Sequence, residues 1–298
     1  MRAAAIACFF GLVLGVVACG GGDEDAGSTA TDATEISLVP ATQPTQSTVP
    51  APTVEIPEEM PTELVVTELT TGSGKAAEEG DTLVVDYVGV RSEDGTEFDS
   101  SYGRQPYPVT LGQSAVIEGW QQGLVGAKSG ARLQLDIPAD LAYGDNPQGQ
   151  VIQPGDALTF VIDVRVVVPP NDPANSPQEE DIATLDSPLT ELVVTDDREG
   201  DGAAIEKGQT AFVNLVLARA DNGVVLASTW SEPGPAQYPV VESASLDGLV
   251  EGIVGMKVGG RRTIKIPYER AFGTDGETTL GLPAETDVIV IVDLVAAY

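Results

Sequence analysis

The chain has no histidine, which removes the commonest metal ligand and the usual general base of enzymes. Histidine-based zinc sites and Ser-His-Asp triads are thereby excluded. Basic residues are also scarce: 15 lysines and arginines stand against 46 aspartates and glutamates among 298 residues, giving a net charge of −31 at pH 7. A surface this acidic repels phosphate backbones, which argues against nucleic acid as a partner.

Only two cysteines occur, Cys8 and Cys19, and both lie near the N-terminus. Arg2 precedes an apolar run over residues 3–17, which is shorter than a membrane-spanning helix requires. The small residues before Cys19 resemble a bacterial lipobox. This predicts a signal peptide over residues 1–18 and a lipid, such as palmitate, on Cys19; in an ordinary secretory signal, Cys19 would be incidental. No cysteine then remains for a disulfide, so the core alone holds the fold.

Two segments lack a sustained apolar period. Residues 19–59 are rich in Gly, Ser, Thr, Pro, Asp and Glu and contain no Lys or Arg, so they are predicted to form a disordered tether. Residues 169–187 begin with Pro-Pro-Asn-Asp-Pro and are predicted to form a linker. The folded units are therefore expected at residues 60–168 and 188–298.

The two folded units are copies of each other. The stretch Thr62–Thr67 (TELVVT) recurs as Thr190–Thr195, 128 residues further along the chain. Three glycines recur at the same offset, and a Gly-Leu-Val-Gly stretch at 123–126 recurs as Gly-Ile-Val-Gly at 252–255. Repetition at this length is typical of duplicated domains and not of a short-period solenoid.

Each copy is predicted to consist mostly of strands. In the first copy, β-branched residues alternate or cluster at 82–90, 132–137 and 157–168. Asp94-Gly95 predicts a hairpin turn, as does Asn222-Gly223 in the second copy. Apolar residues at helical spacing predict one short helix over 115–127. The fold class is therefore expected to be α+β, with each antiparallel sheet curved around one short α-helix.

Aromatic residues make up only 5% of the chain, yet many of them gather between residues 84 and 160. A plain core is built from aliphatic residues, whereas Tyr and Trp combine a large apolar area with a hydrogen-bonding end. Their company with the single carboxylate of Asp99 predicts a concave site for a neutral, mostly apolar ligand. Each ring taken alone would more often belong to a core.

The order of these residues is specific as a set. It reads Val85-Asp86-Tyr87-Val88-Gly89, Phe98-Asp99-Ser100-Ser101, Val116-Ile117-Glu118-Gly119-Trp120 and Ala142-Tyr143-Gly144. This series closely resembles the FKBP-type peptidyl-prolyl cis-trans isomerases, the immunophilins that bind FK506-like macrolides, and the resemblance covers residues 62–168. It implies two tandem domains of that fold and a rotamase reaction that needs no metal and no cofactor.

The resemblance also implies roles for particular residues. Tyr87, Asp99 and Tyr143 would be the catalytic groups, with Asp99 and the Tyr143 hydroxyl at a polar rim. The substrate would lie on Trp120 and contact Phe98, Arg104, Tyr107, Val116, Ile117, Val151, Ile152 and Phe160. The chain departs from the family pattern in three places: the loop with Arg104 is one residue shorter, Tyr107 replaces the usual Phe, and Gln148 stands where many members have His.

The first functional hypothesis is a lipid-anchored foldase at the outer surface of the cytoplasmic membrane. It would isomerise X-Pro bonds in unfolded or exported polypeptides, and FK506-like macrolides would inhibit it. The alternative is a non-catalytic peptide-binding lipoprotein with chaperone activity. A solute receptor is disfavoured, because that class needs two α/β lobes and the alternating pattern is missing.

The second copy keeps the scaffold glycines but loses the polar rim. Carried across by the repeat, Tyr87 becomes Leu215, Phe98 becomes Leu226, Asp99 becomes Ala227, Trp120 becomes Leu249, Tyr143 becomes Phe272 and Phe160 becomes Val290. Tyr107 is expected to survive as Tyr238. The second unit is therefore predicted to be a degenerate domain that holds clients or serves as a spacer or dimerisation surface. Trp230, at the position of Tyr102, is expected to be a buried filler, to fill the vacated pocket or to face a partner.

Overall fold

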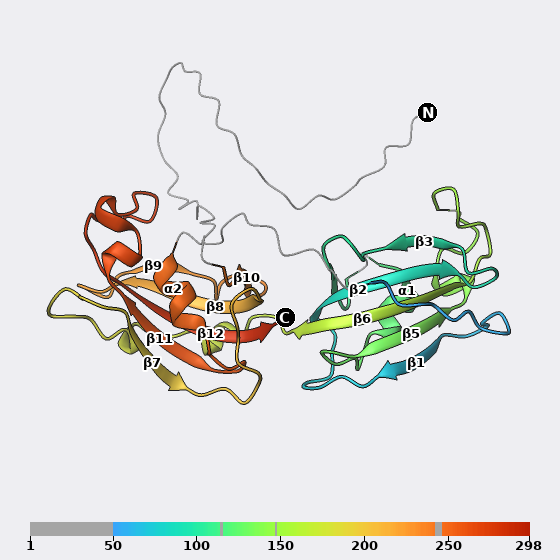
Figure 1. Ribbon diagram of the computed structural model, residues 1–298, viewed down its shortest axis with the longest axis horizontal. Helices are drawn as coiled ribbons and strands as arrows, with labels where there is room; N and C mark the ends of the chain where they lie inside the picture. Colours follow the sequence, from blue (N-terminus) through green and yellow to red (C-terminus); the bar gives the residue numbers. More distant parts are fainter. Residues whose placement is uncertain (1–49, 114–115, 147, 242–245) are drawn as a thin grey trace, which may run out of the picture. The chain divides into compact units, whose positions relative to one another are not determined.

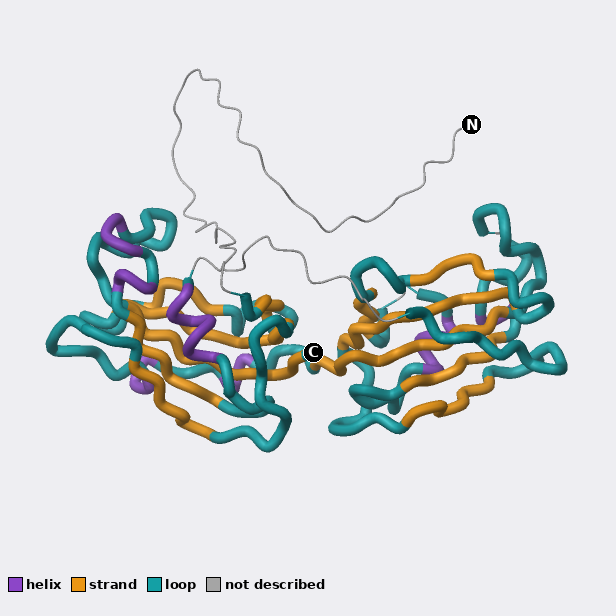
Figure 2. Tube along the Cα trace, viewed as in Figure 1, coloured by secondary structure: helices purple, strands orange, loops and turns teal. Residues whose placement is uncertain are grey.

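The computed structural model describes residues 50–113, 116–146, 148–241 and 246–298. The predicted signal peptide, Cys19 and most of the predicted tether lie outside these residues. The described part holds two antiparallel sheets of six strands, each accompanied by one short α-helix (Figures 1 and 2). The α+β fold class predicted from the sequence is confirmed.

The first sheet has the strand order β1-β5-β6-β2-β3, and β4 pairs with the remaining half of β2. Its central strands are the β-branched runs that the sequence predicts. The elements are β1 (Val65–Thr70), β2 (Thr82–Arg91), β3 (Glu97–Ser100), β4 (Tyr107–Thr110), α1 (Glu118–Gly123), β5 (Arg132–Ile137), η1 (Ala139–Leu141) and β6 (Leu158–Val168).

The second sheet repeats this plan, with the order β10-β8-β12-β11-β7 and β9 paired to β8. Two 3₁₀ helices, η2 (Pro173–Asn175) and η3 (Glu179–Asp181), precede it in the predicted linker. The elements are β7 (Val193–Arg198), β8 (Thr210–Arg219), β9 (Val225–Ser228), β10 (Ala236–Pro239), α2 (Asp247–Ile253), β11 (Arg261–Ile266), η4 (Tyr268–Arg270), η5 (Gly273–Asp275) and β12 (Val288–Ala297).

In each unit the helix covers one face of the sheet, which we call the inner face. Helix α1 approaches β5 so closely that a Cβ on Gly119 would lie 2.4 Å from the Ile137 side chain. The helix is shorter than the predicted 115–127: it begins at Glu118, and Ile117 before it is extended, with ψ at 152°. The apolar spacing of Val116 and Ile117 therefore reflects packing against the core and not helix.

The opposite, outer face of each sheet is covered by the segment that precedes the domain. In the second unit, Ile182 and Leu185 pack with Trp230 on the outer face, and the Leu185 amide donates to the Ala220 carbonyl over 2.8 Å. In the first unit, Gln134 of the sheet donates to the Glu55 carbonyl over 2.9 Å. The last residues of the predicted tether and linker thus pack against the domains they precede.

Candidate active site

Five aromatic rings form one connected cluster on the inner face of the first sheet. The ring centroids of Trp120 on α1 and Phe160 on β6 lie 5.2 Å apart, and those of Trp120 and Tyr87 on β2 lie 5.1 Å apart. Phe98 of β3 lies 5.5 Å from Phe160, and Tyr107 of β4 lies 6.1 Å from Tyr87. All four pairs are edge-to-face, which is a favourable arrangement for aromatic rings.

This ring cluster is buried at its base and open at its rim. Trp120 and Phe160 are only 4% and 5% exposed, whereas Tyr107 is 39% exposed. Tyr87 and Phe98 are half-buried. An apolar base that opens to solvent through half-exposed rings is suited to a ligand that is itself mostly apolar.

Gly89 of β2 gives the rings their room, and the sequence interpretation missed it. Its register places it on the inner face opposite Phe160, and a Cβ there would lie 2.7 Å from both the Phe160 and the Phe98 ring. An inner-facing glycine in a strand is the available signal, because it marks a close approach of another group.

The Asp99 carboxylate holds the polar side of the rim. It accepts hydrogen bonds from the Tyr87 hydroxyl, from the Arg104 guanidinium over 2.6 Å and from the Ser100 amide over 2.9 Å. Burial acts to raise the pKa of Asp99, but these three hydrogen bonds outweigh it and hold that pKa below its ordinary value. Arg104 therefore reaches Asp99 even though its loop is short.

The same contacts shift the partners of Asp99. Burial, reinforced by the hydrogen bond to Asp99 and by its charge, raises the pKa of Tyr87. The hydrogen bond to Asp99 likewise raises the pKa of Arg104. Tyr87 therefore stays a neutral hydrogen-bond donor and Arg104 stays a cation across the whole neutral range.

Two donors at the ring cluster have no partner among the described residues. Tyr143 is half-buried against the apolar core, and its hydroxyl makes no hydrogen bond with any described residue. Burial, followed by the charges of Asp99 and Tyr107, raises the pKa of Tyr143, so this hydroxyl keeps its proton. The amide of Ile117, at the N-cap of α1, also has no described partner. Both groups are free to donate to a ligand.

The other predicted site residues divide into two groups. Val116, Ile117 and Ile152 pack with the apolar core beneath the rings. Val151 is half-buried but is not part of that core, so the structure does not bring it to the ring cluster. The indole N–H of Trp120 is buried and has no hydrogen-bond partner among the described residues.

In the second unit the corresponding interior is closed. Leu215, Leu249 and Val290, at the positions of Tyr87, Trp120 and Phe160, are all buried in one apolar cluster with Leu280 and Leu282. Leu217 stands at the position of Gly89, facing Val290 as Gly89 faces Phe160, and is 1% exposed. Aliphatic side chains thus fill the space that the rings of the first unit leave open.

The expected match between Tyr107 and Tyr238 is wrong. Strand pairing sets Tyr107 opposite Val85, and the equivalent Val213 lies opposite Ala236. Tyr238 instead takes the place of Val109, where it is buried and its hydroxyl has no partner among the described residues. One extra residue before β10 shifts the match, so the second unit has no tyrosine at this rim position.

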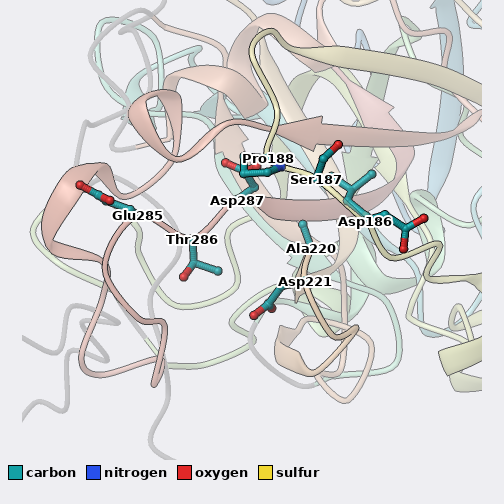
Figure 3. Close-up of a pocket in the computed structure, with 9 residues that line it drawn as sticks. Asp186, Ser187, Pro188, Ala220, Asp221, Glu285, Thr286 and Asp287 are labelled. Atoms are coloured by element: carbon teal, nitrogen blue, oxygen red, sulfur yellow. The ribbon is translucent and has the colours of Figure 1, made fainter.

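A hollow of about 210 Å³ lies elsewhere, at the end of the segment that covers the second sheet (Figure 3). Four carboxylates line it, those of Asp186, Asp221, Glu285 and Asp287. Asp287 is already occupied, because its two oxygens accept from the Leu189 and Tyr268 amides over 2.6 and 2.9 Å. The hollow therefore serves to attach the covering segment.

Neither metal binding nor membrane crossing is indicated by the described residues. Among them, no group of three or more cysteines, aspartates or glutamates is placed to hold a metal ion. No helix within the described ranges is long and apolar enough to span a bilayer.

Comparison with known proteins adds a family to this geometry. The model of the family described as FKBP-type peptidyl-prolyl cis-trans isomerase matches residues 73–165 and 202–295, together more than half of the chain. The FK506-binding protein of Streptomyces anulatus is 44% identical over 119 residues, which is 39% of this chain and 96% of that protein. The FK506-binding protein of Neisseria meningitidis serogroup B is 41% identical over 102 residues, 34% of this chain and 93% of the relative.

A longer match joins both units to one relative. The peptidyl-prolyl cis-trans isomerase FKBP10 of Bos taurus is 32% identical over 235 residues, which is 78% of this chain but 37% of that protein. The repeat seen in the sequence therefore has a counterpart in a protein that is much longer than this chain.

Proposed function

The chain belongs to the FKBP-type peptidyl-prolyl cis-trans isomerases, and we propose that its first domain alone performs the reaction, on exported proteins. The observation that carries the proposal is the open ring cluster with Asp99 and two unpartnered donors at its rim. The closed interior of the second domain supports the restriction to the first.

The ring cluster supplies the apolar surroundings that the reaction needs. An X-Pro bond turns over a barrier of about 18–20 kcal/mol because rotation destroys amide resonance. The twisted amide carries less charge separation than the planar one, so a water-poor pocket favours it over the ground state. The proline ring would lie on Trp120 and Phe160, between the walls formed by Tyr87, Phe98 and Tyr107.

The polar groups at the rim hold the substrate while the bond turns. The Tyr143 hydroxyl and the Ile117 amide donate to the carbonyls on either side of the proline. Asp99 acts through Tyr87 and Arg104, because both of its oxygens already accept hydrogen bonds from described groups. With its pKa held below the ordinary value, Asp99 is not a general base.

The expected clients follow from the N-terminal sequence. A lipobox-like cysteine at position 19 and a polar tether up to residue 49 support a domain anchored by lipid at the extracytoplasmic face of the cell membrane. Proline-containing polypeptides would meet it there before they finish folding. Labelling cells with a palmitate analogue tests the anchor: the Cys19→Ala variant should lose the label and leave the membrane fraction, and labelling that persists in it contradicts this assignment.

The activity is tested on the full chain with a protease-coupled assay of an Ala-Pro-type peptide. Tyr143→Phe and Trp120→Leu should each lower kcat/KM, while Leu249→Ala, the matched change in the second domain, should leave it unchanged. A parent chain with no rate above background sinks the proposal. If that inactive chain still suppresses aggregation of a proline-independent client, the non-catalytic chaperone hypothesis takes its place.

A further inference from the structure

We propose that Tyr102, held on the outer face by Asp163 and Arg132, is a positioning residue for the Asp99–Arg104 pair at the active site. The inference rests on the proposed function of the first domain. It concerns the loop between β3 and β4, residues 101–106, which carries Tyr102 toward one side of the sheet and Arg104 toward the other.

The outer-face end of this loop is fixed by charge-assisted hydrogen bonds. The Tyr102 hydroxyl donates to Asp163 of β6. Arg132 of β5 binds the same carboxylate with two nitrogens, over 2.6 and 2.7 Å. Bidentate pairs of this kind are among the strongest and most directional in proteins. The Tyr102 ring therefore has one well-defined place against the sheet.

The active-site end of the loop has no comparable support. The Arg104 side chain is 61% exposed, and its only side-chain partner among the described residues is Asp99. An exposed arginine held by a single contact samples many rotamers, so the position of its backbone decides how often the contact forms. That position is set by the residues just before it in the loop.

A turn connects the two ends. Gly103 has a φ of +75°, a left-handed conformation that glycine adopts without strain, and the Arg104 amide donates to the Ser101 carbonyl over 2.9 Å. Ser101 is also tied to the active-site strand, because its hydroxyl accepts from the Tyr87 amide over 2.9 Å. The outer-face anchor and the rim of the ring cluster are thus joined by two residues of rigid turn.

The second domain keeps this anchor in another form. Trp230 replaces Tyr102, and the Arg261 guanidinium lies 5.9 Å from the Trp230 ring centroid while it binds Asp293 over 2.5 and 3.0 Å. The position of Asp99 there is Ala227, so no ion pair remains to be positioned. The phenol-to-carboxylate bond therefore occurs in the domain that has the rim pair, and it is absent from the domain that lacks it.

The experiment compares four full-chain proteins with the parent: Tyr102→Phe, Arg104→Ala, the double variant, and Ser92→Ala. The Ser92 control removes another buried outer-face hydrogen bond, 2.9 Å to Thr159, far from the loop. Tyr102→Phe should lower kcat/KM about tenfold, the scale of a small misplacement of a rim group. The double variant should be no worse than Arg104→Ala alone, and Ser92→Ala should keep the parent's activity.

A second readout does not depend on activity. Loss of the Arg104 contact removes a hydrogen bond that lowers the pKa of Asp99, so ¹³C NMR titration of its carboxyl should show that pKa rising in Arg104→Ala and rising part of the way in Tyr102→Phe. An unchanged Asp99 pKa in Tyr102→Phe, losses that add in the double variant, or an equal loss in Ser92→Ala overturns the inference. A parent chain without isomerase activity refutes the proposed function, while the titration still decides the positioning role.

Discussion

The two domains differ most at one buried position on the second long strand of each. Gly89 of the first domain leaves room for Phe98 and Phe160, and Leu217 of the second occupies that room. Around it, rings with polar tips in one domain correspond to leucine and valine in the other. The first interior is open at its rim and the second is filled to its surface.

This difference shows that the fold and the site have separate requirements. Both sheets keep the same strand order, and both helices approach their sheets through a glycine, Gly119 in α1 and Gly248 in α2. What the second domain lacks is everything that would hold a ligand: the inward-facing glycine, the rings and the carboxylate. A scaffold can therefore persist after its site is gone.

The largest expected effect comes from closing the first site. Gly89→Leu gives the first domain the residue of the second, and its Cβ alone would lie 2.7 Å from two rings. We expect isomerase activity to fall by about 100-fold or more, because the rings must leave their places, with a stability loss of about 1–3 kcal/mol from overpacking. The protease-coupled assay and thermal unfolding measure both quantities.

The matched change is Leu217→Gly in the second domain. It should destabilise that domain by a cavity and leave the activity of the full chain intact. Activity retained in Gly89→Leu, or lost in Leu217→Gly, would break the comparison.

The next effect concerns the carboxylate. Asp99→Ala gives the first domain the residue of Ala227, and it should lower kcat/KM about tenfold because Tyr87 and Arg104 lose their common partner. Since the folded pKa of Asp99 lies below its ordinary value, its contacts stabilise the domain above about pH 4 and are lost as the pH falls through the folded pKa.

Thermal unfolding at pH 7 and pH 3 checks this sign. The parent should exceed Asp99→Ala in stability at pH 7, and the difference should shrink at pH 3. A difference that grows in acid contradicts the account. The reverse change, Ala227→Asp, should create no activity, because the rings and Arg104 have no equivalents around it.

A smaller effect tests a buried cation that the second domain alone has. Arg262 stands where the first domain has Leu133, and it donates to the Gly252 and Val254 carbonyls at the end of α2 while it binds Asp196 over 2.7 Å. Arg262→Leu should cost about 1–3 kcal/mol, because two carbonyls at the negative end of the helix lose their donor. Urea unfolding measures this; unchanged stability would show that the carbonyls find other partners.

The smallest effect is expected at Tyr238. Its buried hydroxyl has no partner among the described residues, so Tyr238→Phe removes an unsatisfied group. The second domain should keep its stability or gain up to about 1 kcal/mol. A clear loss would reveal a partner for the hydroxyl.

The sequence predicts much of the fold because its signals are local. β-branched runs mark β2, β5 and β6, and an exact repeat of TELVVT marks the duplication. The helix limits fail, because Val116 and Ile117 face the core in extended conformation and mimic helical spacing. Trp230 is a buried filler, but on the outer face, a side that no count of residues could choose.

The site residues divide in the same way. Their order along the chain locates the ring cluster, and the resemblance names its members. The match of Tyr107 to Tyr238 fails, because only strand register locates the extra residue before β10. Gly89 and Tyr102 act through room and anchorage, which arise from tertiary contacts between distant strands.

Calorimetric titration of the full chain with an FK506-like macrolide tests the central claim most directly, because it counts open pockets without relying on turnover. The account predicts one molecule bound per chain, with binding abolished by Gly89→Leu and untouched by Leu217→Gly. Two molecules bound per chain, or one that survives Gly89→Leu, would contradict it.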